Sequence, residues 1–209
     1  MTRPRAKRRL GQHFLGDPRI LGRIADALEA GPSDTVVEIG PGPGGLTAAL
    51  AERAGRLVAI EKDPELVPAL RALFPGATIV EGDALDLDWH ALAGGPFLAA
   101  GNIPYNITSP LLDKALEPPR PARIVFLVQK EVADRVTAEP GGSEYGALTV
   151  GVQAVARAER LFTVPAGAFQ PRPKVDSAVL RLIPRERPIV SDVERPAFRR
   201  LVVGLFGFR

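Results

Sequence analysis

Val36-Val37-Glu38-Ile39-Gly40-Pro41-Gly42-Pro43-Gly44-Gly45 is the stretch that decides the fold, because a short apolar run leads straight into a glycine-rich turn. Leu46 and the residues after it have a helical pattern, so a strand turns sharply into a helix here. Glycines let the backbone approach a ligand closely, and the first N–H groups of the helix are free to bind it. Gly40, Gly42 and Gly45 satisfy the G-x-G-x-x-G pattern, which predicts a nucleotide-type cofactor at this turn.

Apolar runs alternating with helical or loop segments surround this turn. The first helix is expected over Pro18–Ala30, with Asp17 as its cap and Gly31 as its stop. Such alternation is typical of a parallel sheet with helices on both faces. Two later helices are expected at 130–136 and 145–155. The sequence predicts a Rossmann-like α/β fold with a mostly parallel, seven-stranded sheet whose last two strands form an edge hairpin: Thr35–Ile39, Leu57–Ile60, Ala77–Val80, Phe97–Ala100, Ile124–Val128, Glu159–Val164 and Ser177–Ile183.

Two acidic residues follow the second and third predicted strands, where they are placed to bind an adenosine group. Glu61 has the spacing expected of an acid that accepts hydrogen bonds from ribose hydroxyls, which fits NAD as well as S-adenosylmethionine. Asp83 after the third strand is suited to accept from an adenine amine, although an ordinary Gly-Asp turn is the alternative. Together with Glu38 before the glycine loop, these acids favour a class I S-adenosylmethionine-dependent methyltransferase.

The fourth strand ends in Asn102-Ile103-Pro104-Tyr105, at the sheet edge where open α/β folds place their chemistry. The exocyclic nitrogen of adenine is a poor nucleophile, because its lone pair is delocalised into the ring. The Asn102 side-chain oxygen and the Ile103 carbonyl are suited to accept its hydrogens and aim the lone pair at a sulfonium methyl group. Pro104 would hold that carbonyl outward, and Tyr105 would stack on the base. A structural Asn-Ile-Pro turn is the competing interpretation.

The stiff segment Phe169-Gln170-Pro171-Arg172-Pro173-Lys174-Val175 is a second candidate for base and RNA contacts. Phe169 is expected to present its ring to the other face of the base, with an ordinary core position as the alternative. Arg172 and Lys174 are candidate phosphate contacts, and the alternative is that both are ordinary solvated surface residues. The same two interpretations apply to a basic N-terminal arm, whose cations are Arg3, Arg5, Lys7, Arg8 and Arg9.

Composition excludes several other classes of protein and site. The chain of 209 residues has no Cys and only two His, so neither a disulfide framework nor a thiolate or histidine-rich metal site is expected. No apolar stretch follows the basic N-terminus as in a signal sequence, and no run has the length of a membrane span. We therefore expect a soluble cytoplasmic protein without a metal.

These motifs resemble those of the KsgA and Erm family of ribosomal RNA adenine N6-dimethyltransferases. The resemblance implies S-adenosylmethionine as cofactor and a cofactor site that contains His13, Leu15, Gly40, Gly42, Glu61, Lys62, Asp83, Ala84 and Asn102. His13 departs from the Asn often found at its position. The matching stretches cover residues 7–15, 38–42, 82–85, 102–107, 129–133 and 171–179.

Residues 129–133 and 171–179 are more similar to the KsgA branch than to the Erm branch. The KsgA branch dimethylates two adjacent adenosines in the 3′-terminal hairpin of 16S, small-subunit rRNA during ribosome assembly. The Erm branch modifies 23S rRNA and confers macrolide resistance. An RNA-binding assembly factor with secondary methylation remains an alternative. An NAD-dependent oxidoreductase is disfavoured, because no Tyr-Lys or His-based hydride-transfer group accompanies the loop.

The family resemblance also suggests how the chain is divided. Residues 1–16 would form a basic arm and a lid over the cofactor site, and residues 17–184 the Rossmann-like methyltransferase domain. Residues 185–209 would form a linker, predicted at 184–196, and then the first helix of a truncated C-terminal helical domain. The expected partner is rRNA within the small ribosomal subunit or its precursor, bound by a monomer without a membrane.

Overall fold

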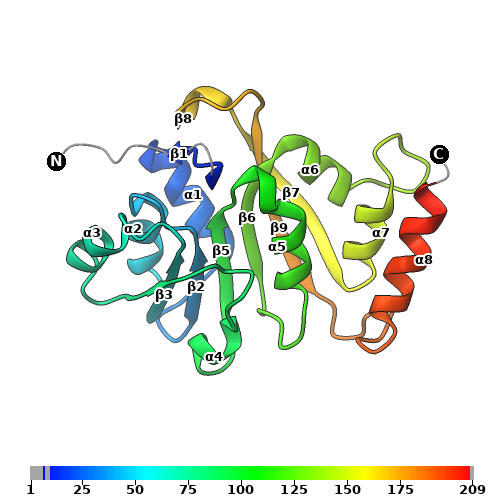
Figure 1. Cartoon of the computed structure of the whole chain (residues 1–209), viewed down its shortest axis with the longest axis horizontal. Coiled ribbons are helices and arrows are strands. Elements are labelled where there is room, and N and C mark those ends of the chain that lie inside the picture. Colours follow the sequence, from blue (N-terminus) through cyan, green and yellow to red (C-terminus); the bar gives the residue numbers. More distant parts are fainter. Residues whose placement is uncertain (1–6, 8–9, 208–209) are drawn as a thin grey trace.

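The computed structural model describes residue 7 and residues 10–207, which build a three-layer α/β fold around a seven-stranded sheet (Figure 1). Strands β4, β3, β2, β5 and β6 are parallel, whereas β9 runs antiparallel between β6 and β7. The predicted fold class and the edge hairpin are thereby confirmed. The strands in spatial order are β4 (Thr78–Glu81), β3 (Arg56–Glu61), β2 (Thr35–Ile39), β5 (Leu98–Asn102), β6 (Ile124–Gln129), β9 (Ser177–Pro184) and β7 (Ala156–Val164).

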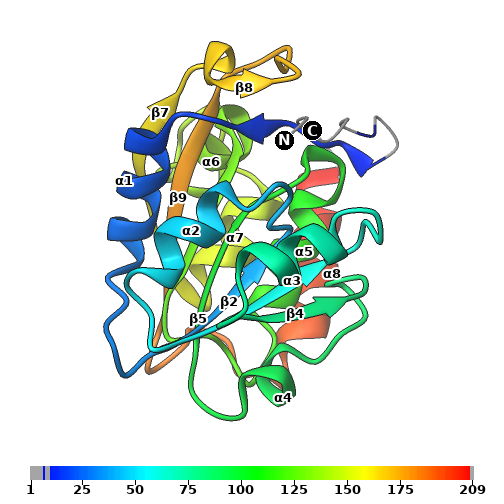
Figure 2. The same ribbon diagram turned by 90° about the vertical axis from the view of Figure 1, so that its left-hand side faces the viewer.

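Helices cover both faces of the sheet, so its central strands are apolar on both sides. In β6, Phe126 belongs to one apolar cluster, and its neighbours Val125 and Leu127 belong to the other. This alternation follows from the two-residue period of a strand. Helices α1 (Pro18–Leu28) and α2 (Gly45–Ala51) lie on one side (Figure 2). The cluster on the opposite side contains residues of α4 (Trp89–Ala93), α5 (Thr108–Ala115), α6 (Lys130–Val136) and α7 (Ala147–Gln153).

The ends of several elements differ from the prediction. Asp17 caps α1 as expected, because its side chain accepts a hydrogen bond from the Arg19 N–H. The predicted stop at Gly31 is wrong, since the left-handed residue that ends the helix is Glu29, with φ 51°. The last helix, α8 (Arg195–Gly207), begins within the predicted linker. Helix α3 (Val67–Leu73) packs beside β4 in a third, smaller apolar cluster.

A second, two-stranded sheet was not predicted. Strand β1 (Phe14–Leu15) pairs antiparallel with β8 (Phe169–Gln170), above the carboxyl edge of the main sheet (Figure 2). The short helices η2 (Tyr105–Ile107) and η3 (Ala166–Ala168) flank this region. The pairing joins two segments about 150 residues apart in the chain, so it fixes the N-terminal segment over the end of the main sheet.

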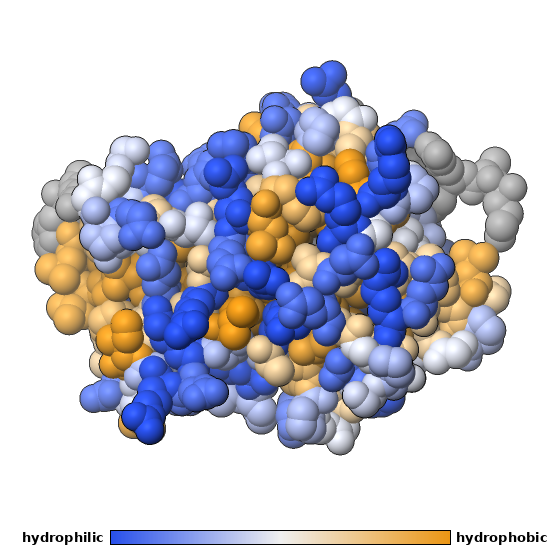
Figure 3. Space-filling model, turned by 180° about the vertical axis from the view of Figure 1, so that it is seen from behind, coloured by the Kyte–Doolittle hydropathy of each residue, from blue (hydrophilic) through white to orange (hydrophobic). Residues whose placement is uncertain are grey.

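Helix α8 packs against α7 at the end of the molecule opposite α3 (Figure 1). Its Val202 is buried, whereas Leu201, Val203 and Leu205 are exposed, and apolar side chains gather at this end in the rear view (Figure 3). Among residues 7 and 10–207, no helix is long and apolar enough to cross a membrane.

Gly101 provides a test of the close contact between β5 and β2. A Cβ at Gly101 would lie 2.6 Å from the Ile39 carbonyl oxygen, so we expect Gly101→Ala to destabilise the fold by about 1–3 kcal/mol through overpacking. Gly151 in α7 has no atom within 4 Å of an added Cβ, and Gly151→Ala should stabilise by about 0.5–1 kcal/mol through helix propensity. Urea unfolding of both variants measures the two changes in the free energy of unfolding. Changes of the same sign in the two variants would contradict the prediction.

Candidate functional site

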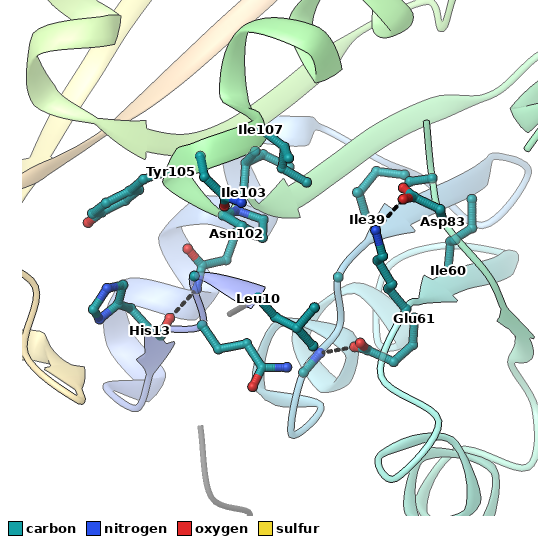
Figure 4. Close-up of a pocket in the computed structure, with 18 of the residues that line it drawn as sticks. Leu10, His13, Ile39, Ile60, Glu61, Asp83, Asn102, Ile103, Tyr105 and Ile107 are labelled. Carbon is teal, nitrogen blue, oxygen red and sulfur yellow. Dashed lines mark hydrogen bonds and ion pairs between the residues drawn. The ribbon is translucent and has the colours of Figure 1, made fainter. Parts of the chain in front are cut away.

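The described residues enclose a cavity at the carboxyl ends of β2, β3, β4 and β5 (Figure 4). The space within the cavity and at its open mouth is about 870 Å³ in all. The cavity lies beside the boundary between β2 and β5, where the order of strands along the chain reverses. The predicted residues that line it are His13, Gly40, Gly42, Glu61, Lys62, Asp83, Ala84, Asn102, Ile103, Pro104 and Tyr105.

Glu61 is the buried acid at the end of β3 and holds the glycine loop in place. Its Oε2 accepts a hydrogen bond of 2.9 Å from the Gly42 N–H, and its Oε1 accepts one of 2.8 Å from the Asp63 N–H. Burial raises the pKa of Glu61, although these N–H groups oppose the shift. Each carboxylate oxygen has a second lone pair. The site thus offers a desolvated carboxyl group suited to hydroxyl donors of a ligand.

Gly42 needs to be glycine both for its own backbone and for its neighbour Phe14. Its φ is +57°, and an added Cβ would lie 3.2 Å from the Phe14 ring. Left-handed backbone of this kind is strained for residues with a side chain. The loop therefore brings bare backbone to the cavity, with Phe14 packed against it.

Asp83 follows β4 and faces Lys62 across the cavity wall. The Lys62 ammonium forms an ion pair with Asp83 Oδ2, and the Leu85 N–H donates to Oδ1 over 3.1 Å. Burial alone would raise the pKa of Asp83, but the Lys62 ammonium and the Leu85 N–H outweigh it and lower that pKa. Asp83 is therefore a carboxylate acceptor, and Lys62 is its partner in the cavity.

The Asn102 side chain is fixed by the N-terminal segment. Its Nδ2 donates a hydrogen bond of 2.8 Å to the His13 carbonyl oxygen (Figure 4). A carbonyl only accepts, so the amide must turn its nitrogen toward His13 and its oxygen the other way. The Ile103 N–H donates to the Leu127 carbonyl over 3.0 Å, which continues the β5–β6 pairing into the loop. The Asn102 oxygen is thus a rigid acceptor on the cavity wall.

Two aromatic rings lie beside the Asn102 amide. The rings of His13 and Tyr105 are stacked, with centroids 5.4 Å apart and an angle of 28° between their planes. The Tyr105 hydroxyl lies 2.8 Å from the Ser177 Oγ, and His13 Nδ1 lies 2.8 Å from the Pro171 carbonyl oxygen. Burial raises the pKa of the Tyr105 hydroxyl. Tyr105 is thus one of the residues that line the cavity, and its stacking on a base stays a prediction.

Phe169 and Leu15 lie in the core rather than at the cavity, which corrects both predictions. They are paired across the β1–β8 sheet, and both are buried in the same apolar cluster. Successive side chains of a strand point to opposite faces, so Phe14 faces the cavity and Leu15 faces the core. The competing interpretation of Phe169 as a core residue is the one that the structure supports.

The predicted cations divide into three groups. Lys7 binds Asp63 and Glu65 over 2.7 and 2.9 Å, so its ammonium is paired with two acids of the chain. Arg172 and Lys174 are exposed and lie outside the lining of the cavity. Arg3, Arg5, Arg8 and Arg9 lie outside the described residues.

Several lining residues were missed by sequence reasoning. Gln12 donates to Asp63 over 3.4 Å and accepts from the Lys7 N–H over 2.7 Å, which holds the N-terminal segment over the cavity. The apolar lining residues could be predicted from the sequence only by their positions next to the predicted acids and glycines. Within the described part of the chain, no cluster of His, Asp or Glu is suited to a metal. The missed residues are Leu10, Gly11, Gln12, Phe14, Ile39, Ile60, Gly82, Asn106 and Ile107.

Comparison with known proteins gives a family and near relatives. The family model "Ribosomal RNA adenine dimethylase" matches residues 3–209. The ribosomal RNA small subunit methyltransferase A of Geobacter sulfurreducens is 45% identical, over 98% of this chain and 77% of its own. The protein of the same name from Phenylobacterium zucineum is 48% identical, over 98% and 73%.

Two solved structures have the same fold and more than 30% identity. The 23S rRNA methyltransferase ErmE aligns with a TM-score of 0.79 and 34% identity, over 90% of this chain and 77% of that one. A dimethyladenosine transferase from Plasmodium falciparum aligns with a TM-score of 0.83 and 32% identity, over 93% and 71%.

Glu38 beneath the glycine loop gives a pH-dependent prediction. It is 1% exposed, its Oε2 has no hydrogen-bond partner among the described residues, and burial with the charge of Glu61 raises its pKa from 4.5 to about 8. Between these values the unfolded chain has lost the proton and the folded chain keeps it. This group should therefore lower the free energy of unfolding by up to about 1.4 kcal/mol per pH unit as the pH rises.

Glu38→Gln removes that titration. The variant should gain stability relative to wild type between about pH 5 and about pH 7.5, as measured by urea unfolding at both values. Glu52→Gln, which changes an exposed acid, is the control. A constant difference between Glu38→Gln and wild type would show that Glu38 keeps its ordinary pKa.

Proposed function

Because the chain belongs to the family of ribosomal RNA adenine dimethylases, we propose that it dimethylates the N6 amines of two adjacent adenosines in the 3′-terminal hairpin of 16S rRNA. S-adenosylmethionine is the methyl donor. Relatives at 43–48% identity carry the small-subunit name, whereas the large-subunit enzyme ErmE is 34% identical, so the small subunit is the favoured target. The observation that carries the activity is the Asn102 amide, locked by the His13 carbonyl with its oxygen free to accept.

The cavity fits this cofactor through its own donors and acceptors. Glu61 is a buried carboxyl group whose fixed partners are backbone N–H groups, and ribose hydroxyls would supply further donors. Asp83 would accept from the adenine amine, with Lys62 beside it. Gly40 and Gly42 have no side chains, so the cofactor would be able to approach the backbone of the loop closely. When bound, the cofactor supplies a methyl group on a positively charged sulfur.

The protein's own part in the reaction is to orient the target amine. Asn102 Oδ1 and the Ile103 carbonyl accept its two hydrogens, which localises the nitrogen lone pair along one direction. Tyr105 supports the base by stacking, and its hydroxyl is anchored to Ser177. Methylation leaves an acidic ammonium, which loses its proton to solvent. The site therefore works without a strong general base.

We also propose the setting in which the protein works. It acts as a monomer in the cytoplasm, on rRNA within the small ribosomal subunit or its precursor. Residues 1–16 serve as arm and lid, because residues 10–14 line the cavity. Residues 17–184 form the catalytic domain, and residues 185–209 form a linker and the helix α8, which packs against α7.

The decisive experiment is methylation of small ribosomal subunits from a strain that lacks this modification. Subunits are incubated with the protein and labelled S-adenosylmethionine, and rRNA nucleosides are then analysed by mass spectrometry. We expect labelled N6,N6-dimethyladenosine in small-subunit rRNA. Label in large-subunit rRNA only, or in no adenosine, would refute the proposal.

The cofactor assignment predicts the effect of Glu61→Ala. Loss of hydrogen bonds to a charged group should weaken S-adenosylmethionine binding by about 1–3 kcal/mol. Calorimetry measures the affinity, and circular dichroism checks that the variant is folded. Glu65→Ala is the matched control, since Glu65 is an acid of the same turn with a 75% exposed side chain. Equal affinities for the two variants would remove the ribose assignment.

The mechanism predicts the effect of Asn102→Ala. Removal of one preorganised acceptor should lower single-turnover methylation by about 10² to 10³, with both substrates saturating. Binding of RNA rests on phosphates and stacking, and should change far less. Asp86→Ala is the control, because Asp86 is an exposed polar residue outside the lining of the cavity. A rate for Asn102→Ala within a few-fold of that control would mean that another group orients the amine.

A further inference from the structure

We propose that Trp89 is a positioning residue for the adenine end of the cofactor site, because its indole fixes the peptide group that holds the Asp83 carboxylate. The inference rests on the proposed function, in which Asp83 accepts the adenine amine of S-adenosylmethionine. Asp83 lies at the end of the cavity away from Tyr105 (Figure 4), and Trp89 is not among the described residues that line the cavity. Trp89 therefore acts through Asp83 and not on the cofactor itself.

One peptide group connects the two side chains. The Trp89 Nε1–H donates a hydrogen bond of 2.8 Å to the Ala84 carbonyl oxygen. The other end of the same peptide group is the Leu85 N–H, which donates to Asp83 Oδ1 over 3.1 Å. A peptide group is planar, so a bond that fixes its carbonyl also fixes the direction of its N–H. The indole thereby sets the position of Asp83 Oδ1.

The Ala84 carbonyl depends on this indole for its hydrogen bond. The turn before α4 is closed at Asp83, whose carbonyl accepts from the N–H groups of Asp86 and Leu87 over 3.0 and 3.2 Å. No backbone N–H of the described residues donates to the Ala84 carbonyl in the same way, and Ala84 is 7% exposed. A buried carbonyl without a partner is unfavourable, so loss of the indole would let this peptide group turn toward water.

The other oxygen of Asp83 has a less rigid partner. Asp83 Oδ2 pairs with the Lys62 ammonium, and the Lys62 side chain is 57% exposed. Long exposed side chains lose rotamer freedom when they pair, so such pairs fix geometry only weakly. Trp89 is 4% exposed and belongs to the apolar cluster that also contains Ile39 and Ile60 of the cavity wall. The buried indole is thus the rigid support of the carboxylate.

A carboxylate held in this way favours a base that carries an amine. Adenine offers Asp83 a hydrogen from its 6-amine, whereas unsubstituted purine has only a carbon-bound hydrogen at that position. An acceptor in a fixed place discriminates strongly between the two, because a ligand without the amine leaves the acceptor unpaired. Trp89 therefore determines how strictly the site selects adenine.

Calorimetry with S-adenosylhomocysteine, and with its analogue that carries purine in place of adenine, tests this role. Wild type should bind the adenine compound about ten- to hundredfold more tightly, as expected for one hydrogen bond to a charged acceptor. Trp89→Phe keeps an aromatic ring in the core and removes the N–H, and it should reduce this preference to about threefold. A preference that stays at the wild-type value in Trp89→Phe would overturn the proposal.

A matched control separates positioning from packing. Phe97 is another aromatic residue of the same apolar cluster and is also 4% exposed. Phe97→Leu should keep the wild-type preference for adenine, whatever it does to the free energy of unfolding measured in urea. If Phe97→Leu lost the preference as Trp89→Phe does, loss of packing would explain both results, and the proposal would fail.

Nuclear magnetic resonance gives a readout on the unaltered protein, which does not depend on the folding of a variant. The chain has one tryptophan, so its indole N–H gives a single signal in a spectrum that correlates nitrogen-15 with its proton. Saturation with S-adenosylhomocysteine should move this signal further than saturation with the purine analogue. The amine bonds to Asp83, and the change passes through the peptide group to the indole hydrogen bond. Equal shifts with the two compounds, or no shift with either, would overturn the proposal.

These measurements separate the inference from the proposed function. They need neither RNA nor methyl transfer, so a protein that methylates no adenosine would still show whether Trp89 positions Asp83. In an active protein, Trp89→Phe should raise KM for S-adenosylmethionine about tenfold and leave kcat within about threefold, because saturating cofactor compensates for the weakened site. If wild type makes dimethyladenosine and Trp89→Phe keeps the wild-type KM and preference for adenine, only the inference fails.

Discussion

The hydrogen bond from Asn102 Nδ2 to the His13 carbonyl is the contact on which the arrangement of the site depends. It joins the end of β5 to a segment 89 residues earlier in the chain. Because a carbonyl only accepts, this bond alone decides which way the amide oxygen points. It also places the His13 ring beside Tyr105. One contact therefore orients the proposed acceptor of the target amine and holds the N-terminal segment over the cavity.

That contact lies at the edge of the sheet where the carboxyl ends of the parallel strands meet. Glu61 ends β3, Asp83 follows β4, and Asn102 ends β5, so three polar groups converge although they are distant in sequence. The central strands are buried on both faces, which leaves the strand ends as the place for polar side chains. The fold thus separates a rigid apolar frame from a polar rim that carries the chemistry.

The polar groups at the strand ends were predictable where short sequence patterns determine their position. The prediction failed where the position depends on pairing between distant segments. The glycine loop, Glu61, Asp83 and the Asn102 loop follow apolar runs that the sequence displays directly. Leu15 and Phe169 were misplaced, because their environment depends on the β1–β8 pairing of two-residue strands that have no periodic pattern. The ion pair of Lys7 was not predictable for a similar reason, since its partner Asp63 is 56 residues away. Side-chain direction in such segments is set by tertiary contacts.

Glu61 and Asp63 show how neighbouring acids take different roles. Both are buried, at 4% and 1% exposure. Asp63 receives the Lys7 ammonium and the Gln12 amide, which overcome burial and lower its pKa. Glu61 has backbone N–H partners but no cation among the described residues, so burial prevails and its pKa is raised. Hydroxyl groups of a ligand would therefore give Glu61 hydrogen-bond donors that it lacks, whereas Asp63 already has its donors within the chain. The N-terminal segment that satisfies Asp63 through Lys7 and Gln12 leaves Glu61 open to the ribose hydroxyls that we propose as its ligands.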